Sequence, residues 1–108
     1  KPLKEVTTAC IGILKKEGST IVRIAVARAL LRMQTEEKKA ITELSKSLKS
    51  AEQWSRLHAA IVLDEANEKA RPALPALKNA LKNQPNKYIV RVANKAVNDL
   101  LGTANTVK

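Results

Sequence analysis

The sequence is poor in the residue types that most often carry chemistry or cross-links. Its 108 residues include one cysteine (Cys10), one histidine (His58), one tryptophan, one tyrosine and no phenylalanine. A single cysteine excludes an internal disulfide and a cysteine-based zinc site, and a single histidine excludes a two-histidine metal site. Neither residue has a partner at catalytic spacing. We therefore predict no metal, no cofactor and no catalytic residue, so that the chain is not an enzyme.

Long apolar runs, secretory signals and glycine-rich phosphate loops are also missing. We therefore predict no membrane partner, while the compartment stays open. The length suits a single domain, residues 1–108. The chain begins Lys1-Pro2-Leu3 without methionine, so we expect a piece of a longer protein that is monomeric by itself.

Positive charge is what the sequence has in excess. Twenty Lys and Arg residues stand against ten Asp and Glu residues, for a formal net charge of +10, and they are spread along the chain. This balance favours a polyanionic partner. The alternative is that a basic helical surface only keeps the domain soluble.

Apolar residues follow a helical period along the whole chain. The expected helices span about 3–17, 20–33, 36–49, 51–66, 72–81 and 87–101. The residues that favour helix ends are Gly18 as a left-handed C-terminal residue, Ser19 or Thr20 and Thr35 as N-caps, Ser50 with Gln53 as a capping box, Pro72 as a first helical residue, Asn86 as an N-cap and Gly102 as a stop.

These helices repeat in register. The apolar stripe of the third helix recurs 33 residues later in the fifth, as Ile41, Leu44 and Leu48 against Leu74, Leu77 and Leu81. One arginine of each second helix recurs at 33 and 35, as Arg23, Arg56 and Arg91. One helix pair cannot bury its apolar face alone, whereas stacked pairs can. The period predicts an all-α solenoid of about six helices in three two-helix repeats, at about 3–34, 36–67 and 70–102.

Two stretches carry a family resemblance. Residues 70–77 read Ala-Arg-Pro-Ala-Leu-Pro-Ala-Leu, and residues 88–93 read Tyr-Ile-Val-Arg-Val-Ala. This text resembles a short HEAT repeat, which implies a right-handed α-α superhelix. Gln53–Val107 is also similar to the helical repeat domain that follows the catalytic domain in some bacterial sulfatase-like proteins, on residues 54–64 and 98–102. That resemblance implies a domain that packs on a catalytic domain, in a parent that is exported.

The chain departs from both patterns. Many HEAT repeats carry an Asp in the turn within each unit, where this chain has Glu17, Ser50 and Asn83, so at most one charged rung of that ladder is expected. A sulfatase needs a Cys or Ser followed by x-Pro-x-Arg, and nothing of this kind follows Cys10. No sulfatase residue can be carried over.

The remaining candidate residues have structural interpretations that we favour. Cys10 lies on an apolar stripe and is expected in the core, and His58 is expected to be a packed or half-exposed helix residue and not a base or ligand. Asp64 and Glu65 point about 100° apart on a helix, so we interpret them as solvated acids and not as an acid/base pair. Trp54 could stack on a base or a sugar, but we favour packing between repeats because Tyr88 has the equivalent first-turn position.

Two functions are compatible with these features. The first is a non-catalytic protein-interaction or packing module that docks on another protein or on the catalytic domain of its parent. The second is binding of a polyanion, either nucleic acid or sulfated glycan, through a basic concave face of second helices. That face would contain Arg23, Arg28, Arg32, Arg56, Arg91 and Lys95. The alternative role of these residues is to brace turns and neighbouring helices. Docking predicts exposed apolar patches, and polyanion binding predicts a contiguous basic groove.

Overall fold

The computed structural model describes residues 2–16, 18–82 and 84–106. In chain order the elements are α1 (Pro2–Lys16), α2 (Thr20–Arg32), α3 (Glu37–Ser47), α4 (Gln53–Ala66), the 3-10 helix η1 (Asn67–Ala73), α5 (Leu74–Asn79) and α6 (Lys87–Leu101). No described residue lies in a strand, so the predicted all-α class is confirmed. Within the same residues no helix is both long and apolar enough to cross a membrane.

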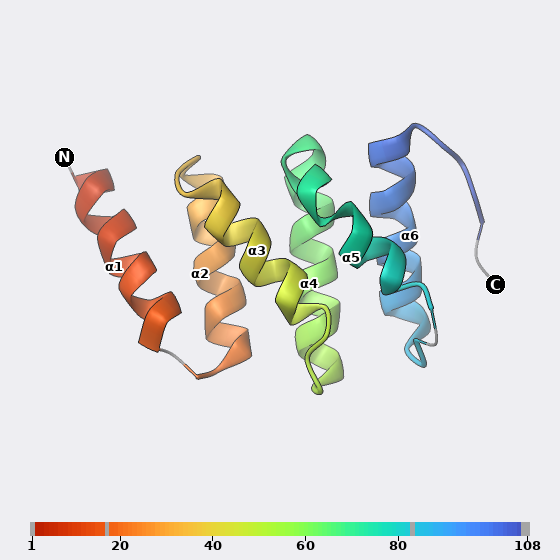
Figure 1. Cartoon of the computed structure of the whole chain (residues 1–108), viewed down its shortest axis with the longest axis horizontal. Helices are drawn as coiled ribbons and strands as arrows, with labels where there is room; N and C mark the ends of the chain where they lie inside the picture. Colours follow the sequence, from red (N-terminus) through yellow and green to blue (C-terminus); the bar gives the residue numbers. More distant parts are fainter. Residues whose placement is uncertain (1, 17, 83, 107–108) are drawn as a thin grey trace.

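The helices form two layers (Figure 1). α2, α4 and α6 lie side by side and nearly parallel in one layer, α3 and α5 cross in front of them at an angle, and α1, tilted in the same sense, lies beside α2 at one end. α4 packs on both α2 and α6, and α3 packs on η1 and α5, whereas α1 packs on α2 and has at most a marginal contact with α3. The molecule measures 46 × 29 × 16 Å, and the N- and C-termini of the chain lie at opposite ends of its long axis.

The core lies between the two layers and is aliphatic. Its largest fully buried apolar side chains are Leu30, Leu44, Leu63, Leu77 and Ile89. Alanines fill the closest helix contacts, because a methyl side chain lets two helix backbones approach. The fully buried ones are Ala27, Ala40, Ala59, Ala60, Ala70 and Ala93. Cys10 belongs to the same cluster, which confirms its predicted place in the core.

Three predicted helix ends are confirmed. Ser19 caps α2, since its hydroxyl accepts a hydrogen bond from the amide of Val22. Asn86 caps α6 through the amides of Tyr88 and Ile89. Gly102 ends α6 with a φ of 67°, a left-handed conformation that glycine adopts without steric cost.

Other predicted ends are wrong, and each has a local reason. Gly18 does not have a positive φ. Glu36, and not Thr35, precedes α3, and it does so in a left-handed conformation with no side-chain cap. Glu52 replaces Ser50 as the cap of α4, because its carboxylate accepts from the amides of Trp54 and Ser55 and is the stronger acceptor at a positive helix end.

The fifth helix also differs from its prediction. Pro72 does not begin an α-helix but lies inside η1, and α5 starts only at Leu74. Pro72 and Pro75 remove two amide donors from this segment, and the tighter 3-10 turn brings Ala70 and Ala73 into the core. Glu17 and Asn83, the turn residues expected at two of the ladder positions, lie outside the described residues.

Candidate binding surfaces

The predicted concave residues are on α2, α4 and α6, and most of them have partners. Arg23 on α2 donates from Nε and Nη2 to the carboxylate of Glu43 on α3, at 2.8 and 2.6 Å. The carboxylate is buried, with 9% of its side chain exposed. The hydrogen bonds from Arg23 lower the pKa of Glu43, against the opposing effect of burial. Arg23 therefore ties the two layers together.

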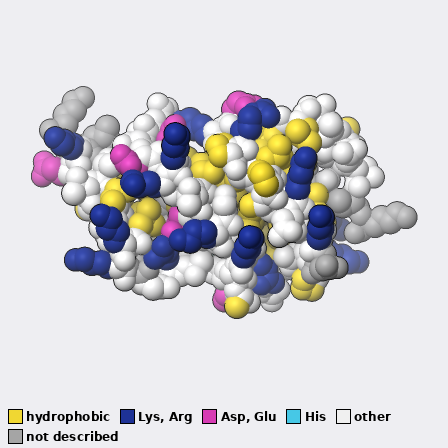
Figure 2. Space-filling view, in the orientation of Figure 1, with side chains coloured by type: hydrophobic (Ala, Val, Ile, Leu, Met, Phe, Trp, Pro, Cys, Tyr) yellow, Lys and Arg dark blue, Asp and Glu magenta, His cyan; other side chains and the backbone are white. Residues whose placement is uncertain are grey.

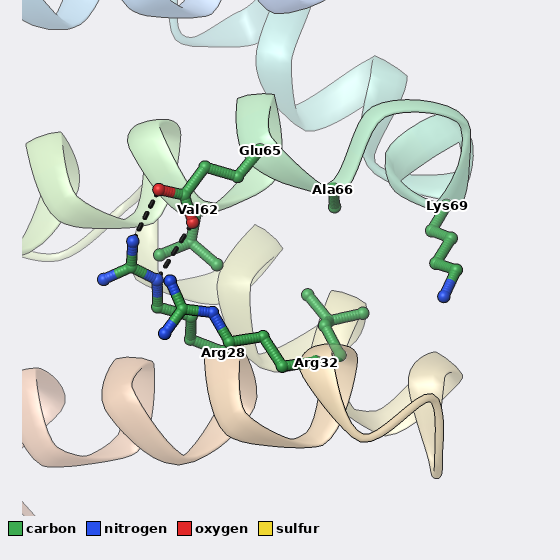
Figure 3. A pocket seen from close by; sticks show the side chains of 7 residues that line it. Arg28, Arg32, Val62, Glu65, Ala66 and Lys69 are labelled. Atoms are coloured by element: carbon green, nitrogen blue, oxygen red, sulfur yellow. Dashed lines mark hydrogen bonds and ion pairs between the residues drawn. The ribbon is translucent and has the colours of Figure 1, made fainter.

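Arg28 makes a second bidentate ion pair, here between two helices of the same layer (Figure 3). Its Nε and Nη2 donate to the carboxylate of Glu65 on α4, at 2.9 and 2.5 Å. Arg32 lies one turn further along α2 and has no ion pair among the described residues. Both arginines line a hollow of about 350 Å³ between α2 and α4, which Lys69 also borders. Lys69 is itself paired with Glu37, at 2.7 Å.

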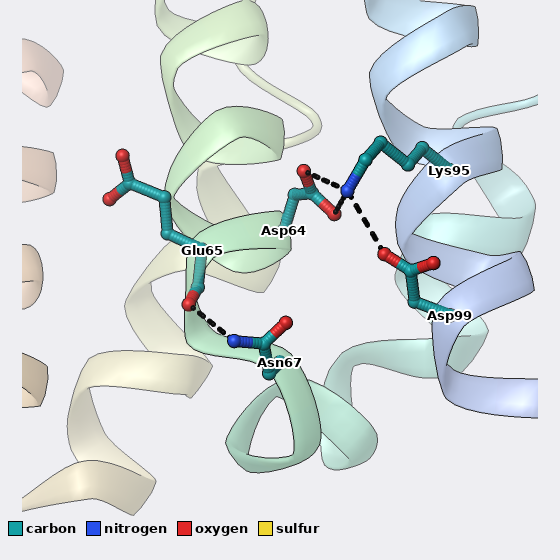
Figure 4. Close-up of polar contacts among 5 residues, drawn as sticks. All are labelled: Asp64, Glu65, Asn67, Lys95 and Asp99. Atoms are coloured by element: carbon teal, nitrogen blue, oxygen red, sulfur yellow. Dashed lines mark hydrogen bonds and ion pairs between the residues drawn. The ribbon is translucent and has the colours of Figure 1, made fainter.

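Lys95 on α6 has two acidic partners (Figure 4). Its ammonium group lies 3.2 Å from Asp64 of α4 and 3.0 Å from Asp99 one turn further along α6. The pKa of Lys95 is raised by its hydrogen bond to Asp99, which has the larger effect, and by its hydrogen bond to Asp64. Asp64 thus points to α6 while its neighbour Glu65 points to α2. The prediction that both acids are merely solvated is wrong, because each pairs with a cation of the adjacent helix.

Arg56 braces a turn. Its Nη1 donates to the carbonyls of Ser50 and Ala51, at 2.8 and 3.2 Å, and Nη2 reaches the side-chain oxygen of Gln84 at 3.5 Å. Arg91 is exposed and has no polar partner among the described residues. Of the six residues proposed for a concave site, only Arg32 and Arg91 therefore present a charge without a partner in that part of the chain. The face is a bracing network more than a basic groove.

Most of the uncompensated charge lies at the edge that contains the α1–α2, α3–α4 and α5–α6 turns (the lower edge in Figure 1), which also includes three of these six residues. We call this the basic edge. Its basic residues are Lys15, Lys16, Arg23, Lys46, Lys49, Arg56, Lys78, Lys82, Lys87 and Arg91. Its described acidic residues are Glu43 and Glu52. Figure 2 shows Lys and Arg side chains gathered over the lower half of this view.

We call the opposite edge, at the other ends of the same helices, the mixed edge. Its acidic residues are Glu5, Glu36, Glu37, Asp64, Glu65, Glu68 and Asp99. Its basic residues are Lys4, Arg28, Arg32, Lys38, Lys39, Lys69, Arg71 and Lys95. The sequence contains one signal for the basic edge, since Lys16, Lys49 and Lys82 recur at intervals of 33 residues. Composition alone does not show this pattern.

A row of exposed apolar side chains follows the basic edge. Ile21, Trp54 and Tyr88 are each the second residue of α2, α4 and α6, and they are 46, 52 and 65% exposed. The prediction that Trp54 and Tyr88 pack between repeats is wrong, because more than half of each side chain is exposed. The N-termini of α4 and α6 are linked directly, since Asn86 donates to the side-chain oxygen of Gln53 at 3.0 Å.

An apolar groove lies between α1 and α3. It has a volume of about 310 Å³ and is lined by Ile11, Leu14, Lys15, Lys38, Lys39, Thr42 and Glu43. Ile11 and Leu14 are half-buried, and the three lysines have no acidic partner in the described parts of the chain. Figure 2 shows hydrophobic side chains at this place with Lys or Arg side chains around them. Glu43 contributes no free negative charge, because Arg23 holds its carboxylate.

No other site for chemistry stands out in the described residues. They contain no group of three or more His, Cys, Asp or Glu side chains placed to hold a metal ion. His58 is exposed on α4, where a packed or half-exposed residue was predicted, and its Nδ1 lies 2.8 Å from the carbonyl of Trp54. Comparison of the chain with family models, curated proteins and solved structures finds no match.

Proposed function

We propose that this chain is a non-catalytic protein-binding module built as a short right-handed HEAT-like solenoid of three two-helix repeats. The alternation of helices between two layers supports this arrangement, and so does the period of 33–35 residues in the sequence. Each second helix begins at an equivalent place, with Ile21, Trp54 and Tyr88 in its second position. The resemblance to the repeat domain of sulfatase-like proteins stays a prediction.

The groove between α1 and α3 is the observation that carries this proposal. It combines an apolar floor, Ile11 and Leu14, with positive charge on both walls from Lys15, Lys38 and Lys39. Apolar surface drives association, and unpaired charge at the rim selects a partner of opposite sign. The occupant that fits is an amphipathic helix with one apolar stripe and acidic flanks.

The packing of α3 shows why the groove suits a helix. One flank of α3 is covered by η1 and α5, and α1 does not cover the other flank in the same way. A partner helix laid between α1 and α3 would bury Ile11 and Leu14 and place its carboxylates beside the three lysines. The alternative, polyanion binding through the predicted concave face, has less support, because Arg23, Arg28 and Lys95 carry acidic partners there.

Isotope-labelled protein titrated with two synthetic peptides tests the proposal. Both peptides are amphipathic helices of about 18 residues, or five turns. They share one leucine stripe, but one has Glu flanks and the other Lys flanks. We expect the acidic peptide to bind more tightly and to shift amide resonances around Ile11, Leu14 and Thr42. Equal binding of the two peptides, or shifts outside α1 and α3, would contradict the groove.

Matched variants sharpen this test. Leu14→Glu places a carboxylate on the groove floor and should abolish acidic-peptide binding, while Ile13→Glu makes the same change on the exposed side of α1 and should not. Lys38→Glu with Lys39→Glu changes only exposed positions, so it reports on the rim without threatening the fold. Binding that survives this charge reversal would remove charge complementarity from the proposal.

A further inference from the structure

The basic edge carries two parallel rows with one residue from each helix pair. Lys16 is the last residue of α1, and Lys49 and Lys82 lie in the turns that follow α3 and α5; all three are exposed and recur at intervals of 33 residues. The first turns of α2, α4 and α6 supply Ile21, Trp54 and Tyr88. One row is cationic and the other is apolar, with two aromatic rings. Such a pair of rows is a surface for a polymer that alternates anions with flat apolar groups.

Local helix stability does not account for this charge. Lysine at a helix C-terminus complements the helix dipole, which explains Lys16 and Lys49 in part. Lys87 and Arg91 lie instead in the N-terminal half of α6, where the dipole disfavours cations, and they flank Tyr88. No acidic residue occupies the first turn of α2 or α6, although the dipole would favour one there, and only α4 has an acid at its N-terminus, the cap Glu52.

The two aromatic rings are held in a common frame. The hydrogen bond from Asn86 to Gln53 joins the residues next to Trp54 and close to Tyr88. Asn86 is itself fixed by its cap bonds to α6, and Glu52 is fixed by its cap bonds to α4. Neither ring is covered, since Trp54 is 52% and Tyr88 65% exposed. The backbone that carries each ring is therefore held in place, while the ring itself is exposed.

From this arrangement we infer that the basic edge binds single-stranded nucleic acid, with its phosphates along the row Lys16, Lys49 and Lys82 and its bases stacked on Trp54 and Tyr88. The two rows share no residue with the lining of the α1/α3 groove, and the inference goes beyond the function proposed above. A duplex fits less well, because its bases are already stacked and would leave both rings unused. A lipid surface fits less well, because Trp54 enters it only together with the exposed Glu52 carboxylate.

Intrinsic fluorescence gives a direct readout, because Trp54 is the only tryptophan in the chain. The protein is titrated with an oligo(dT) strand, and binding is followed by the anisotropy of a labelled strand and by Trp54 emission. We expect saturable quenching of Trp54 by the single strand. We expect weaker binding, with no quenching, for a duplex of equal length and for a heparin oligosaccharide.

Two triple variants with the same loss of charge separate this site from general attraction. Lys16→Ala with Lys49→Ala and Lys82→Ala should weaken strand binding at least about tenfold and reduce the slope of log K against log salt by about 2. Lys4→Ala with Lys38→Ala and Lys39→Ala removes the same charge at the mixed edge and should leave binding nearly unchanged. Tyr88→Ala should weaken the single strand but not heparin.

Three results would overturn the inference. Equal weakening by both triple variants would show attraction by net charge alone. Duplex or heparin binding as tight as strand binding, without quenching, would show that the rings are unused. A blue shift of Trp54 on vesicles of anionic lipid, without quenching by oligo(dT), would assign the edge to a membrane. The Leu14→Glu variant binds the strand normally if the two surfaces are separate, so failure of the groove proposal is seen independently.

Discussion

At the mixed edge, Arg28, Lys69 and Lys95 lie against carboxylates of a neighbouring helix, whereas at the basic edge most cations face solvent. Arg28 meets Glu65, and Lys95 meets Asp64, so each of these pairs joins two helices of one layer. Lys69 meets Glu37 in the same way across the other layer. Among the described residues, the basic edge has one such pair, between Arg23 and Glu43. Successive helices run in opposite directions, so each contributes one end to each edge.

This difference separates two uses of the same residue types. A charge with a partner across a helix contact mainly specifies how the two helices pack, and it contributes little to long-range attraction. A charge without a partner raises the local potential and attracts ligands of opposite sign. The net charge of +10 is therefore not spread evenly over the surface. It belongs mostly to the edge that also exposes Trp54 and Tyr88.

The Arg23–Glu43 pair is the largest test of this comparison, since it is a paired charge on the basic edge. Glu43→Gln should lower the free energy of unfolding by about 2 kcal/mol, because it weakens two charge-assisted hydrogen bonds to a buried group. Urea denaturation measures the change. Arg23→Ala made in the Glu43→Gln background should cost less than Arg23→Ala alone, and simple additivity would mean that the pair contributes nothing.

Acid titration checks the same pair independently. The pKa of Glu43 is lower in the folded chain than in the unfolded chain, so the unfolded state takes up its proton first as the pH falls. Its stabilisation is complete above the usual glutamate pKa and is lost as the pH falls through the lowered value. Thermal melts should therefore show a smaller acid-induced loss for Glu43→Gln than for the wild type. Parallel curves would contradict the lowered pKa.

The next largest effect concerns the hydrogen bonds of Asn86, which hold the first turns of the helices that carry Trp54 and Tyr88. Asn86→Ala removes the cap of α6 and the hydrogen bond to Gln53, and it should cost about 1 kcal/mol. Ser19→Ala is the matched control on α2, where the cap bond is longer, at 3.4 Å. The cost of Ser19→Ala should be smaller. Thermal denaturation of both variants provides the measurement, and the opposite order would argue against the link between α4 and α6.

A smaller effect is expected from the pairs of the mixed edge. A double-mutant cycle on Arg28 and Glu65 should give a coupling of about 0.5 kcal/mol at low salt, because both side chains are partly exposed. The coupling should nearly vanish at molar salt, where screening is strong. A coupling that is unchanged by salt would show that the pair acts through packing and not through charge.

The smallest expected effect is a change in the free energy of unfolding that has opposite signs at the two edges. Lys87→Glu relieves repulsion at the basic edge and places an acid at the N-terminus of α6, so it should stabilise the fold by about 0.5 kcal/mol. Lys69→Glu breaks the pair with Glu37 and adds a third acid beside Glu68, so it should be destabilising by a similar amount. Chemical denaturation of the two variants compares them. Shifts of the same sign would mean that the two edges do not differ in their electrostatics.

Particular residues show how much of the structure could be predicted from the sequence. Ser19, Asn86 and Gly102 were correctly assigned as helix ends, because capping depends on groups within three residues. Ser50 was wrong because a nearby glutamate could take its place, and propensity does not rank two adjacent caps. Trp54 was wrong because burial depends on whether another helix covers the first turn. The partners of Arg28 and Lys95 lie 37 and 31 residues away, beyond any local pattern.

The sequence by itself determined the all-α class and the aliphatic core of this protein. Both follow from the spacing of apolar residues along the chain, which each segment carries regardless of its neighbours. Only the tertiary structure decided which cations are neutralised, which aromatic rings stay exposed and where the groove beside α3 opens. These depend on which helix ends meet across the fold, and side chains far apart in sequence take on their charge environment only when the helices are brought side by side.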